Sequence, residues 1–164
     1  MSRLNELAAQ VAEQLKARGE TIAVAESSSG GLISAALLAV PGASAYFQGG
    51  CVVYTGKARM EFLRLRREDV AGMRSASEPY AQLLASTVRE NFGTTWGLSE
   101  TGAAGPRGNA YGDASGHTCL AVAGPIDTAF TLETGHDDRA RNMDEFAVAA
   151  LELLLQMMAT RGDN

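Results

Sequence analysis

The chain has 164 residues, 46% of them hydrophobic and 20% charged, and its 14 basic and 19 acidic side chains give a formal net charge of −5. This length and composition predict a single globular domain over residues 1–164 and exclude global disorder. The acidic balance argues against a protein that holds a nucleic-acid backbone, because such proteins usually need a basic face.

Cysteine usage and hydropathy exclude further classes of protein. Cys51 and Cys119 lie in apolar, strand-like runs. Two cysteines are too few for a disulfide scaffold or a zinc site, so we expect buried free thiols and no metal. Glycines and Pro41 interrupt the uncharged stretch over 27–56, which excludes a membrane span there. Because the N-terminus also lacks a secretory signal pattern, we expect a cytoplasmic protein without a membrane partner.

Hydrophobic spacing predicts alternating helices and strands in the first part of the chain. Apolar residues from Leu4 to Leu15 recur at helical spacing, with Ser2 as the cap and Gly19 as the stop. The elements predicted next are a strand over 21–26, a helix over 32–40 that is apolar all round and therefore buried, a loop or short helical turn over 43–50, and a strand over 51–55.

Later in the chain, two strands follow each other without a helix between them. A helix opens at Ser77-Glu78-Pro79, since serine caps well and proline is tolerated in the first turn. The other elements predicted here are a helix or turn around Met60 and Leu63, a strand over 95–101, a glycine-rich loop over 102–116, a strand pair over 117–123 and 129–133, and a helix over 141–160. This order predicts a layered α/β domain whose mixed sheet has at least one antiparallel strand.

The segment Ala25–Gly31 joins the first predicted strand to a helix and is the most informative part of the sequence. The N–H groups of a helix start can hold a phosphate, a carboxylate or a developing oxyanion. Serine and glycine are also the residues that any helix start prefers. Functional and purely capping interpretations are therefore equally favoured by spacing alone.

Two further segments are candidates for binding. Gly102–Pro106 follows the third predicted strand, and in a parallel sheet it would meet the first segment at the carboxyl edge, the usual binding crevice. It lacks the Gly-Lys-Ser/Thr of a Walker phosphate loop. Gly135–Arg139 precedes the last helix, where Arg139 is able to bind a phosphate bidentately. A helix cap by Asp137 or Asp138 with a solvated arginine is the interpretation that these residues favour by themselves.

Together these segments resemble the C-terminal domain of the CinA (competence/damage-inducible) proteins, which also occurs alone as a nicotinamide-nucleotide amidase. The resemblance covers roughly residues 4–160. The corresponding family motifs are Ala-Glu-Ser-Cys-Thr-Gly-Gly at 25–31, Tyr-Ser-Asn from Tyr54, Val-Ser-Glu-Pro at 76–79, Ser-Gly-Ile-Ala-Gly-Pro at 101–106 and Gly-Asp-Arg at 137–139.

The resemblance implies a three-layer α/β/α domain with a mixed, mostly parallel sheet of about five strands. It also implies hydrolysis of the carboxamide of nicotinamide mononucleotide, without a cofactor or metal. Ser27 would be the nucleophile, with Tyr54 and residue 59 completing the site and the 27–31 amides holding the oxyanion. The residues that would bind this pyridine nucleotide are Ser29, Gly30, Gly31, Thr101, Gly102, Ala104, Gly105 and Arg139.

Residue 59 departs from the family pattern in a way that matters chemically. The family has a lysine there and this chain has Arg59, whose guanidinium stays protonated and cannot act as a base. Lys57 is two residues away, on nearly the opposite side of a helix. Other departures are Gly56 for an asparagine, Glu100 for an apolar residue, His117 for a threonine and Met143 for an arginine.

Three hypotheses therefore remain open. The first is an amidase with Ser27 as its nucleophile. The second is a catalytically degenerate protein that binds a nucleotide or a partner without hydrolysis, because of Arg59. The third is a structural or oligomer-forming module, since apolar helices in small α/β domains often support self-association, and we expect a homo-oligomer.

Overall fold

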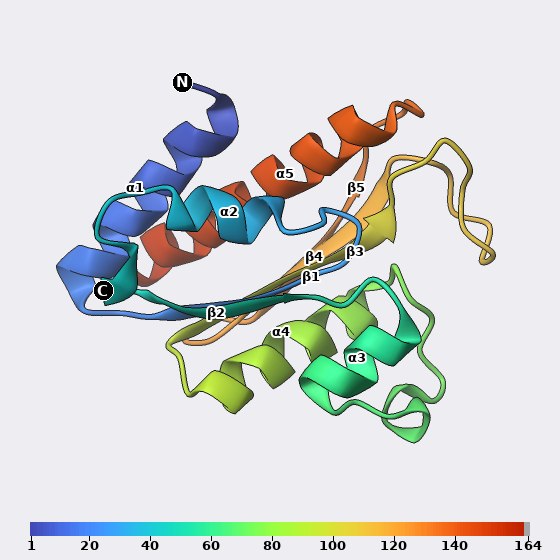
Figure 1. Cartoon of the computed structure of the whole chain (residues 1–164), viewed down its shortest axis with the longest axis horizontal. Helices are drawn as coiled ribbons and strands as arrows, with labels where there is room; N and C mark the ends of the chain where they lie inside the picture. The colour runs from blue at the N-terminus through green and yellow to red at the C-terminus, as the bar shows by residue number, and fades with distance from the viewer. Residues whose placement is uncertain (163–164) are drawn as a thin grey trace.

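A computed structural model describes residues 1–162, in which a five-stranded sheet lies between two layers of helices (Figure 1). The strands are β1 (Ile22–Glu26), β2 (Phe47–Val52), β3 (Trp96–Ala103), β4 (His117–Ala123) and β5 (Thr128–Glu133), in the order β2-β1-β3-β4-β5. β1 pairs in parallel with β2 and β3, while β4 is antiparallel to both of its neighbours. The predicted mixed, mostly parallel sheet is confirmed.

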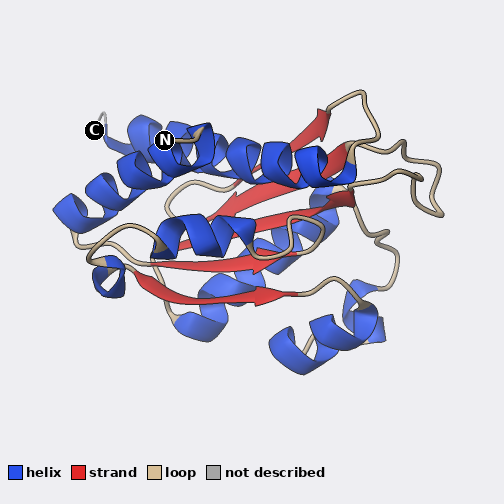
Figure 2. Cartoon of the chain, turned by 45° about the horizontal axis from the view of Figure 1, so that its top comes forward, coloured by secondary structure: helices blue, strands red, loops and turns tan. Residues whose placement is uncertain are grey.

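α-Helices cover both faces of the sheet (Figures 1 and 2). The first layer contains α1 (Arg3–Arg18), α2 (Leu32–Leu38) and α5 (Arg139–Gly162), and the second contains α3 (Gly56–Leu63) and α4 (Glu78–Phe92). The predicted ends of α1 are confirmed, since the Ser2 side chain accepts a hydrogen bond from the Asn5 amide and Gly19 adopts a left-handed conformation. Among the described helices, none is long and apolar enough to cross a membrane.

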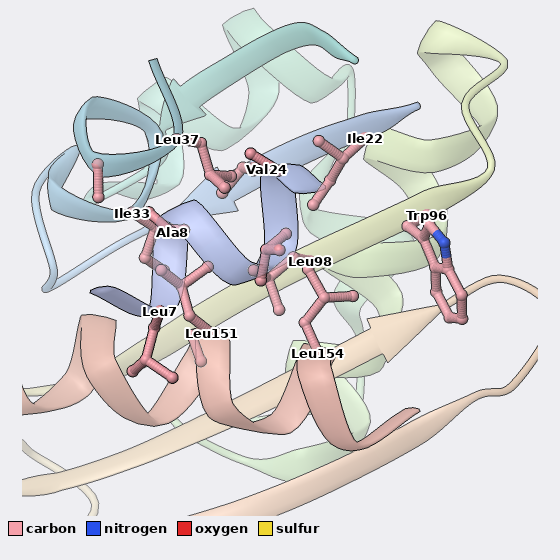
Figure 3. Close-up of a cluster of buried hydrophobic side chains, with 14 of the residues drawn as sticks. Leu7, Ala8, Ile22, Val24, Ile33, Leu37, Trp96, Leu98, Leu151 and Leu154 are labelled. Atoms are coloured by element: carbon pink, nitrogen blue, oxygen red, sulfur yellow. The ribbon is translucent and has the colours of Figure 1, made fainter. Parts of the chain in front are cut away.

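The main core lies between the sheet and the α1, α2 and α5 layer (Figure 3). The fully buried side chains of Ile22, Val24, Trp96 and Leu98 project from β1 and β3 into it. Ala23 and Ala25, also in β1, pack against the α4 side instead. Because helices cover both of its faces, β1 reads as a continuous apolar run rather than as an alternating one.

Two predictions about the chain after β1 are wrong in part. For residues 43–50 the sequence predicts a loop or short helical turn; a short 3-10 helix is present over Ala43–Ala45, but β2 begins at Phe47 and includes Gly49 and Gly50. A Cβ atom on Gly49 would lie 2.5 Å from the Phe92 ring, so this glycine marks a close approach within a strand rather than a turn. The helix expected over 32–40 ends at Leu38, which is 54% exposed, so only one face of α2 is buried.

The topology brings the predicted site segments to one edge of the sheet. β1 and β3 are parallel neighbours, so the turn after Glu26 and the loop after Ala103 leave the same edge. The Ser27 amide donates to the Glu100 carbonyl oxygen at 3.0 Å, which joins the two segments directly. β3 extends two residues into the predicted loop, because Gly102 and Ala103 still pair with β4.

Candidate active site

Glu26, the last residue of β1, caps the start of α2. Its Oε1 atom accepts from the Ser29 hydroxyl at 2.7 Å, the Gly31 amide at 3.1 Å and the Ile33 amide at 3.0 Å. Its Oε2 atom accepts from the Ser34 amide at 2.9 Å. A fully buried carboxylate therefore satisfies amides that a helix start leaves unpaired, and its charge complements the helix dipole.

Glu100 holds the preceding turn from the neighbouring strand. Its Oε1 atom accepts from the Ser27 amide at 3.1 Å and the Ser29 amide at 2.7 Å. Its Oε2 atom accepts from the Ser28 hydroxyl at 2.5 Å and the Thr118 hydroxyl at 2.8 Å. The side chain is fully buried, so the sheet contributes a second carboxylate to the interior of this turn.

The expectation that the amides of residues 27–31 hold an oxyanion is therefore wrong for four of the five amides. Glu100 and Glu26 occupy those of Ser27, Ser29 and Gly31, and the Gly30 amide donates to the Ser27 carbonyl oxygen. Among the described residues, the Ser28 amide is the one of these five without an acceptor. Capping, the alternative interpretation of this segment, accounts for the other four.

Ser27 differs from the two serines that follow it. The Ser28 and Ser29 hydroxyls donate to Glu100 and Glu26, whereas the Ser27 hydroxyl makes no hydrogen bond to another described residue. Ser27 retains 9% exposure, and Ser29 has none. Among the three serines of this turn, Ser27 thus has the hydroxyl without a hydrogen-bond partner in the described residues. The Ser29 side chain is part of the α2 cap.

A second group of predicted residues meets at the surface of the same edge. Arg139, the first residue of α5, donates from Nη1 to the Gly105 carbonyl oxygen at 2.6 Å and from Nη2 to the Tyr54 hydroxyl at 3.2 Å. Tyr54 is 57% exposed. Asp138 caps the helix by accepting from the Arg141 amide at 3.2 Å, so the predicted cap is present, but Arg139 is bonded rather than simply solvated.

Arg59 lies elsewhere, at the contact between α3 and α4. Its Nε atom donates to the Leu65 carbonyl oxygen at 3.3 Å and its Nη1 atom to the Tyr80 hydroxyl at 3.5 Å. The described residues show no hydrogen bond from Arg59 to Ser27 or Tyr54. Lys57 is exposed and has no such partner among them either. The geometry therefore assigns Arg59 a packing contact and brings no amine base to Ser27.

The other predicted binding residues belong to β3 and to the turn after β1. Thr101 is 2% exposed and accepts from the Ala76 amide at 3.2 Å. A Cβ atom on Gly102 would lie 2.5 Å from the His117 carbonyl oxygen, which reflects tight pairing with β4. Gly30 and Gly31 both have positive φ angles, of 67° and 100°, as the turn requires.

Asn142 is a residue of this region that the sequence did not indicate. It is fully buried, and its Nδ2 atom donates to the Ala104 carbonyl oxygen at 2.8 Å and to the His136 carbonyl oxygen at 3.0 Å. It thereby fixes the loop after β3 to α5. An asparagine in a helix pattern normally predicts a solvent-facing position, so no sequence signal marked it.

A hollow of about 570 Å³ lies next to the start of α5. Its lining residues are Ala114, Ser115, Gly135, His136 and Asp137. The His136 Nδ1 atom accepts from the Asp138 amide at 3.3 Å, and its Nε2 atom lies 3.0 Å from Glu145 Oε2. In the described part of the chain, no three His, Cys, Asp or Glu side chains gather closely enough to hold a metal ion.

Known proteins share this sequence pattern. Residues 4–158 match the family model of the CinA C-terminal domain. A CinA-like protein of Anaeromyxobacter sp. (strain K) is 40% identical over 150 residues, which cover 92% of this chain and 37% of that protein. For a CinA-like protein of Trichormus variabilis the identity is 37% over 158 residues, with 94% and 38% covered. The chain thus spans less than two fifths of the length of these relatives.

Solved structures share the fold. A CinA superfamily protein from Klebsiella pneumoniae superposes with a TM-score of 0.89 at 26% identity, covering 96% of this chain and 98% of that one. The competence/damage inducible protein CihA from Agrobacterium tumefaciens gives a TM-score of 0.88 at 26% identity, covering 95% and 96%. The residues that match the family model, 4–158, include the three segments at the site edge. The chain belongs to the CinA C-terminal domain family.

Proposed function

We propose that the chain hydrolyses the carboxamide of nicotinamide mononucleotide, with Ser27 as the nucleophile. The observation that supports this most is the uncommitted Ser27 hydroxyl at the carboxyl edge, where its neighbours Ser28 and Ser29 are both hydrogen-bonded. Tyr54, Gly105 and Arg139 gather at that edge and offer a cation and a phenol to an anionic substrate.

In the proposed reaction the Ser27 oxygen bonds to the carboxamide carbon and its proton passes to a base. The C–N bond then breaks, ammonia leaves with a proton, and an acyl ester remains on Ser27. Water hydrolyses this ester to nicotinate mononucleotide. The Ser28 amide is the donor available to the oxyanion, and Arg139 would bind the phosphate.

The base in this scheme is a group other than Arg59. A guanidinium does not give up its proton, and the Arg59 side chain is bonded to Leu65 and Tyr80. Lys57 carries an amine in the same short helix. Lys57→Met tests whether that amine takes the proton: a loss of kcat with unchanged KM would assign it this role, and an unchanged kcat would exclude it.

The direct test measures ammonia release from nicotinamide mononucleotide by the purified chain. Ser27→Ala should lower kcat by about a thousandfold or more, as loss of a serine nucleophile does in other hydrolases. Ser44→Ala is the matched control, because Ser44 is exposed and lies in a surface turn. Wild-type release no faster than that of Ser27→Ala would reject the amidase.

A second candidate function is nucleotide binding without hydrolysis, which the packing contacts of Arg59 favour. A binding-only protein should be stabilised against heat by the mononucleotide, because a ligand specific for the folded state raises the unfolding temperature. It should also release no ammonia. If Arg59→Lys creates ammonia release in an inactive wild type, residue 59 is the cause of the loss; if wild type is already active, this candidate fails.

A further inference from the structure

Glu100 is a charged side chain at the centre of the sheet whose position the proposed chemistry leaves unexplained. It is fully buried, and in the parallel register of β1 and β3 it lies directly opposite Glu26. Two carboxylates at facing positions repel each other, and burying either one is costly unless hydrogen bonds compensate. The energetic cost of burying Glu100 beside Glu26 indicates that Glu100 has a role that offsets this cost.

The four hydrogen bonds to Glu100 use the carboxylate completely. Two backbone amides bind one oxygen, and two hydroxyls bind the other. An ionised carboxyl group offers about four acceptor sites, so none is left to receive a proton from Ser27. Glu100 is thus not a base for this site, and its effect must pass through the residues it holds.

Three of the four donors belong to the turn that carries Ser27. They are the amide of Ser27 itself, the hydroxyl of Ser28 and the amide of Ser29. The fourth, the Thr118 hydroxyl, comes from β4, which pairs with β3 in the interior of the sheet. Glu100 therefore ties the turn to two central strands, which are the most rigid support that this fold offers.

We propose that Glu100 is a positioning residue, which fixes the backbone of residues 27–29 so that Ser27 alone keeps a free hydroxyl and Ser28 a free amide. This inference rests on the proposed function for its kinetic consequence. Misplacing a nucleophile by about 1 Å is able to cost about a hundredfold in rate, so the contacts of Glu100 should appear in kcat rather than in KM.

The sharpest experiment compares two variants that each remove one hydroxyl from the same carboxylate oxygen. Ser28→Ala removes the hydroxyl on the turn, and Thr118→Val removes the one on β4. Both leave Glu100 one donor short, so similar losses of stability are expected. Ser28→Ala should lower kcat by about tenfold, and Thr118→Val should leave it within about twofold of wild type. Equal effects of the two variants on kcat would overturn the proposal.

Two substitutions of Glu100 itself separate its hydrogen bonds from its charge. In Glu100→Gln the amide oxygen still accepts from the two backbone amides, and the amide nitrogen donates to the two hydroxyls, which are free to rotate. Glu100→Gln should therefore keep kcat within about threefold of wild type, whereas Glu100→Ala should lower it by about a hundredfold with little change in KM. A folded Glu100→Ala protein with wild-type kcat contradicts the proposal; if that variant does not fold, the Ser28 and Thr118 pair decides.

A failure of the amidase is distinguished from a failure of this inference by a second readout. The rate of Ser27 labelling by an organofluorophosphonate, followed by intact mass with Ser27→Ala as the blank, needs no natural substrate. The proposed positioning role makes a prediction even if wild type releases no ammonia. Wild type and Glu100→Gln should then both be labelled at Ser27. Ser28→Ala should be labelled at least tenfold more slowly, because the misplaced hydroxyl reacts more slowly. Equal labelling rates, or no labelling of wild type, overturn it.

Discussion

At the scale of single residues, Glu26 is the side chain that caps the start of α2. The helix has only Gly31 as its capping residue, and that residue has no side chain to bond the first amides. Glu26 supplies the bonds from five to eight positions earlier in the chain. The Ala-Glu-Ser triplet is thus structural at its second position, whatever its third position does.

Glu26→Ala should destabilise the protein by about 3 kcal/mol or more, because several buried donors lose their acceptor at once and each costs about 1–3 kcal/mol. Urea unfolding followed by circular dichroism measures the change. Glu26→Gln is the control, since its amide oxygen still accepts from the donors on one side. A smaller loss in Glu26→Ala than in Glu26→Gln would show that this account of the cap is wrong.

The two cysteines provide a second residue-scale prediction. Burial, reinforced by the negative charge of Glu26, raises the pKa of Cys51 to about 11. Burial also raises the pKa of Cys119, which is fully enclosed in β4. At pH 8 a thiol with a pKa near 11 is a thiolate about one part in a thousand of the time, so Cys51 should react slowly with iodoacetamide in the folded state. Cys119 should also react slowly, because it is buried and its pKa is raised.

Labelling in urea should be fast at both positions, because an unfolded cysteine has a pKa of about 8.5. Mass spectrometry of the folded and the unfolded protein gives the two rates. Labelling of Cys51 at the same rate in both states would contradict the burial that the structure gives it. The sequence predicted buried free thiols, which is correct for Cys119, while Cys51 is half-buried.

At the scale of elements, close approach of β3 and α4 depends on Gly97. A Cβ atom at this position would lie 2.1 Å from the Ala85 carbonyl oxygen and 2.8 Å from the Arg89 Cβ. Gly97→Ala should therefore destabilise the protein by about 2–3 kcal/mol, because neither the helix backbone nor the strand has room to move without losing its packing. Thermal or urea unfolding provides the measurement.

Gly56 gives the matched control for this prediction. It is the exposed first residue of α3, and the nearest atom to an added Cβ would be Arg59 Nη2 at 3.7 Å. Gly56→Ala should leave stability unchanged or raise it by up to about 1 kcal/mol, since alanine is the better helix former. Similar losses in the two variants would mean that the helix-to-strand contact is not what requires Gly97.

The elements also show which parts of the structure local sequence is able to predict. The caps at Ser2, Gly19 and Ser77 are local signals, and α1 and α4 begin or end where these predict. β2 was missed in part because Gly49 is explained by the distant Phe92 ring, and Gly50 by the Ser34 and Phe47 side chains. The capture of the turn amides by Glu100 was missed for the same reason, since over 70 residues separate the partners.

At the scale of the whole molecule, His117 joins segments that are far apart in the chain. Its Nε2 atom lies 2.8 Å from the Ala76 carbonyl oxygen and its Nδ1 atom 2.5 Å from Glu133 Oε1 in β5. Asp113 lies 3.7 Å from Nε2 and is itself paired with Arg74. The ring therefore connects the sheet, the segment before α4 and the long loop after β3. Self-association, which the sequence led us to expect, stays a prediction.

This position makes stability depend on pH. Burial lowers the pKa of His117, but the hydrogen bonds to Glu133 and the Ala76 carbonyl oxygen, with the charge of Asp113, outweigh it and raise the pKa above 6.5. The folded state thus binds this proton more tightly than the unfolded state. The resulting stabilisation is complete below pH 6.5 and is lost as the pH rises through the folded-state pKa.

The free energy of unfolding of wild type should accordingly fall as the pH is raised from about 6.5 upward, because the unfolded chain loses this proton at a lower pH than the folded protein does. His117→Gln should be less stable at pH 6 and should show a flatter dependence, because glutamine is able to donate to Ala76 but carries no proton that titrates in this range. Urea unfolding of both proteins at several pH values tests this. Parallel pH profiles of the two proteins would rule out His117 as the source of the pH dependence. The contacts of His117 would then contribute equally to the free energy of unfolding in either protonation state.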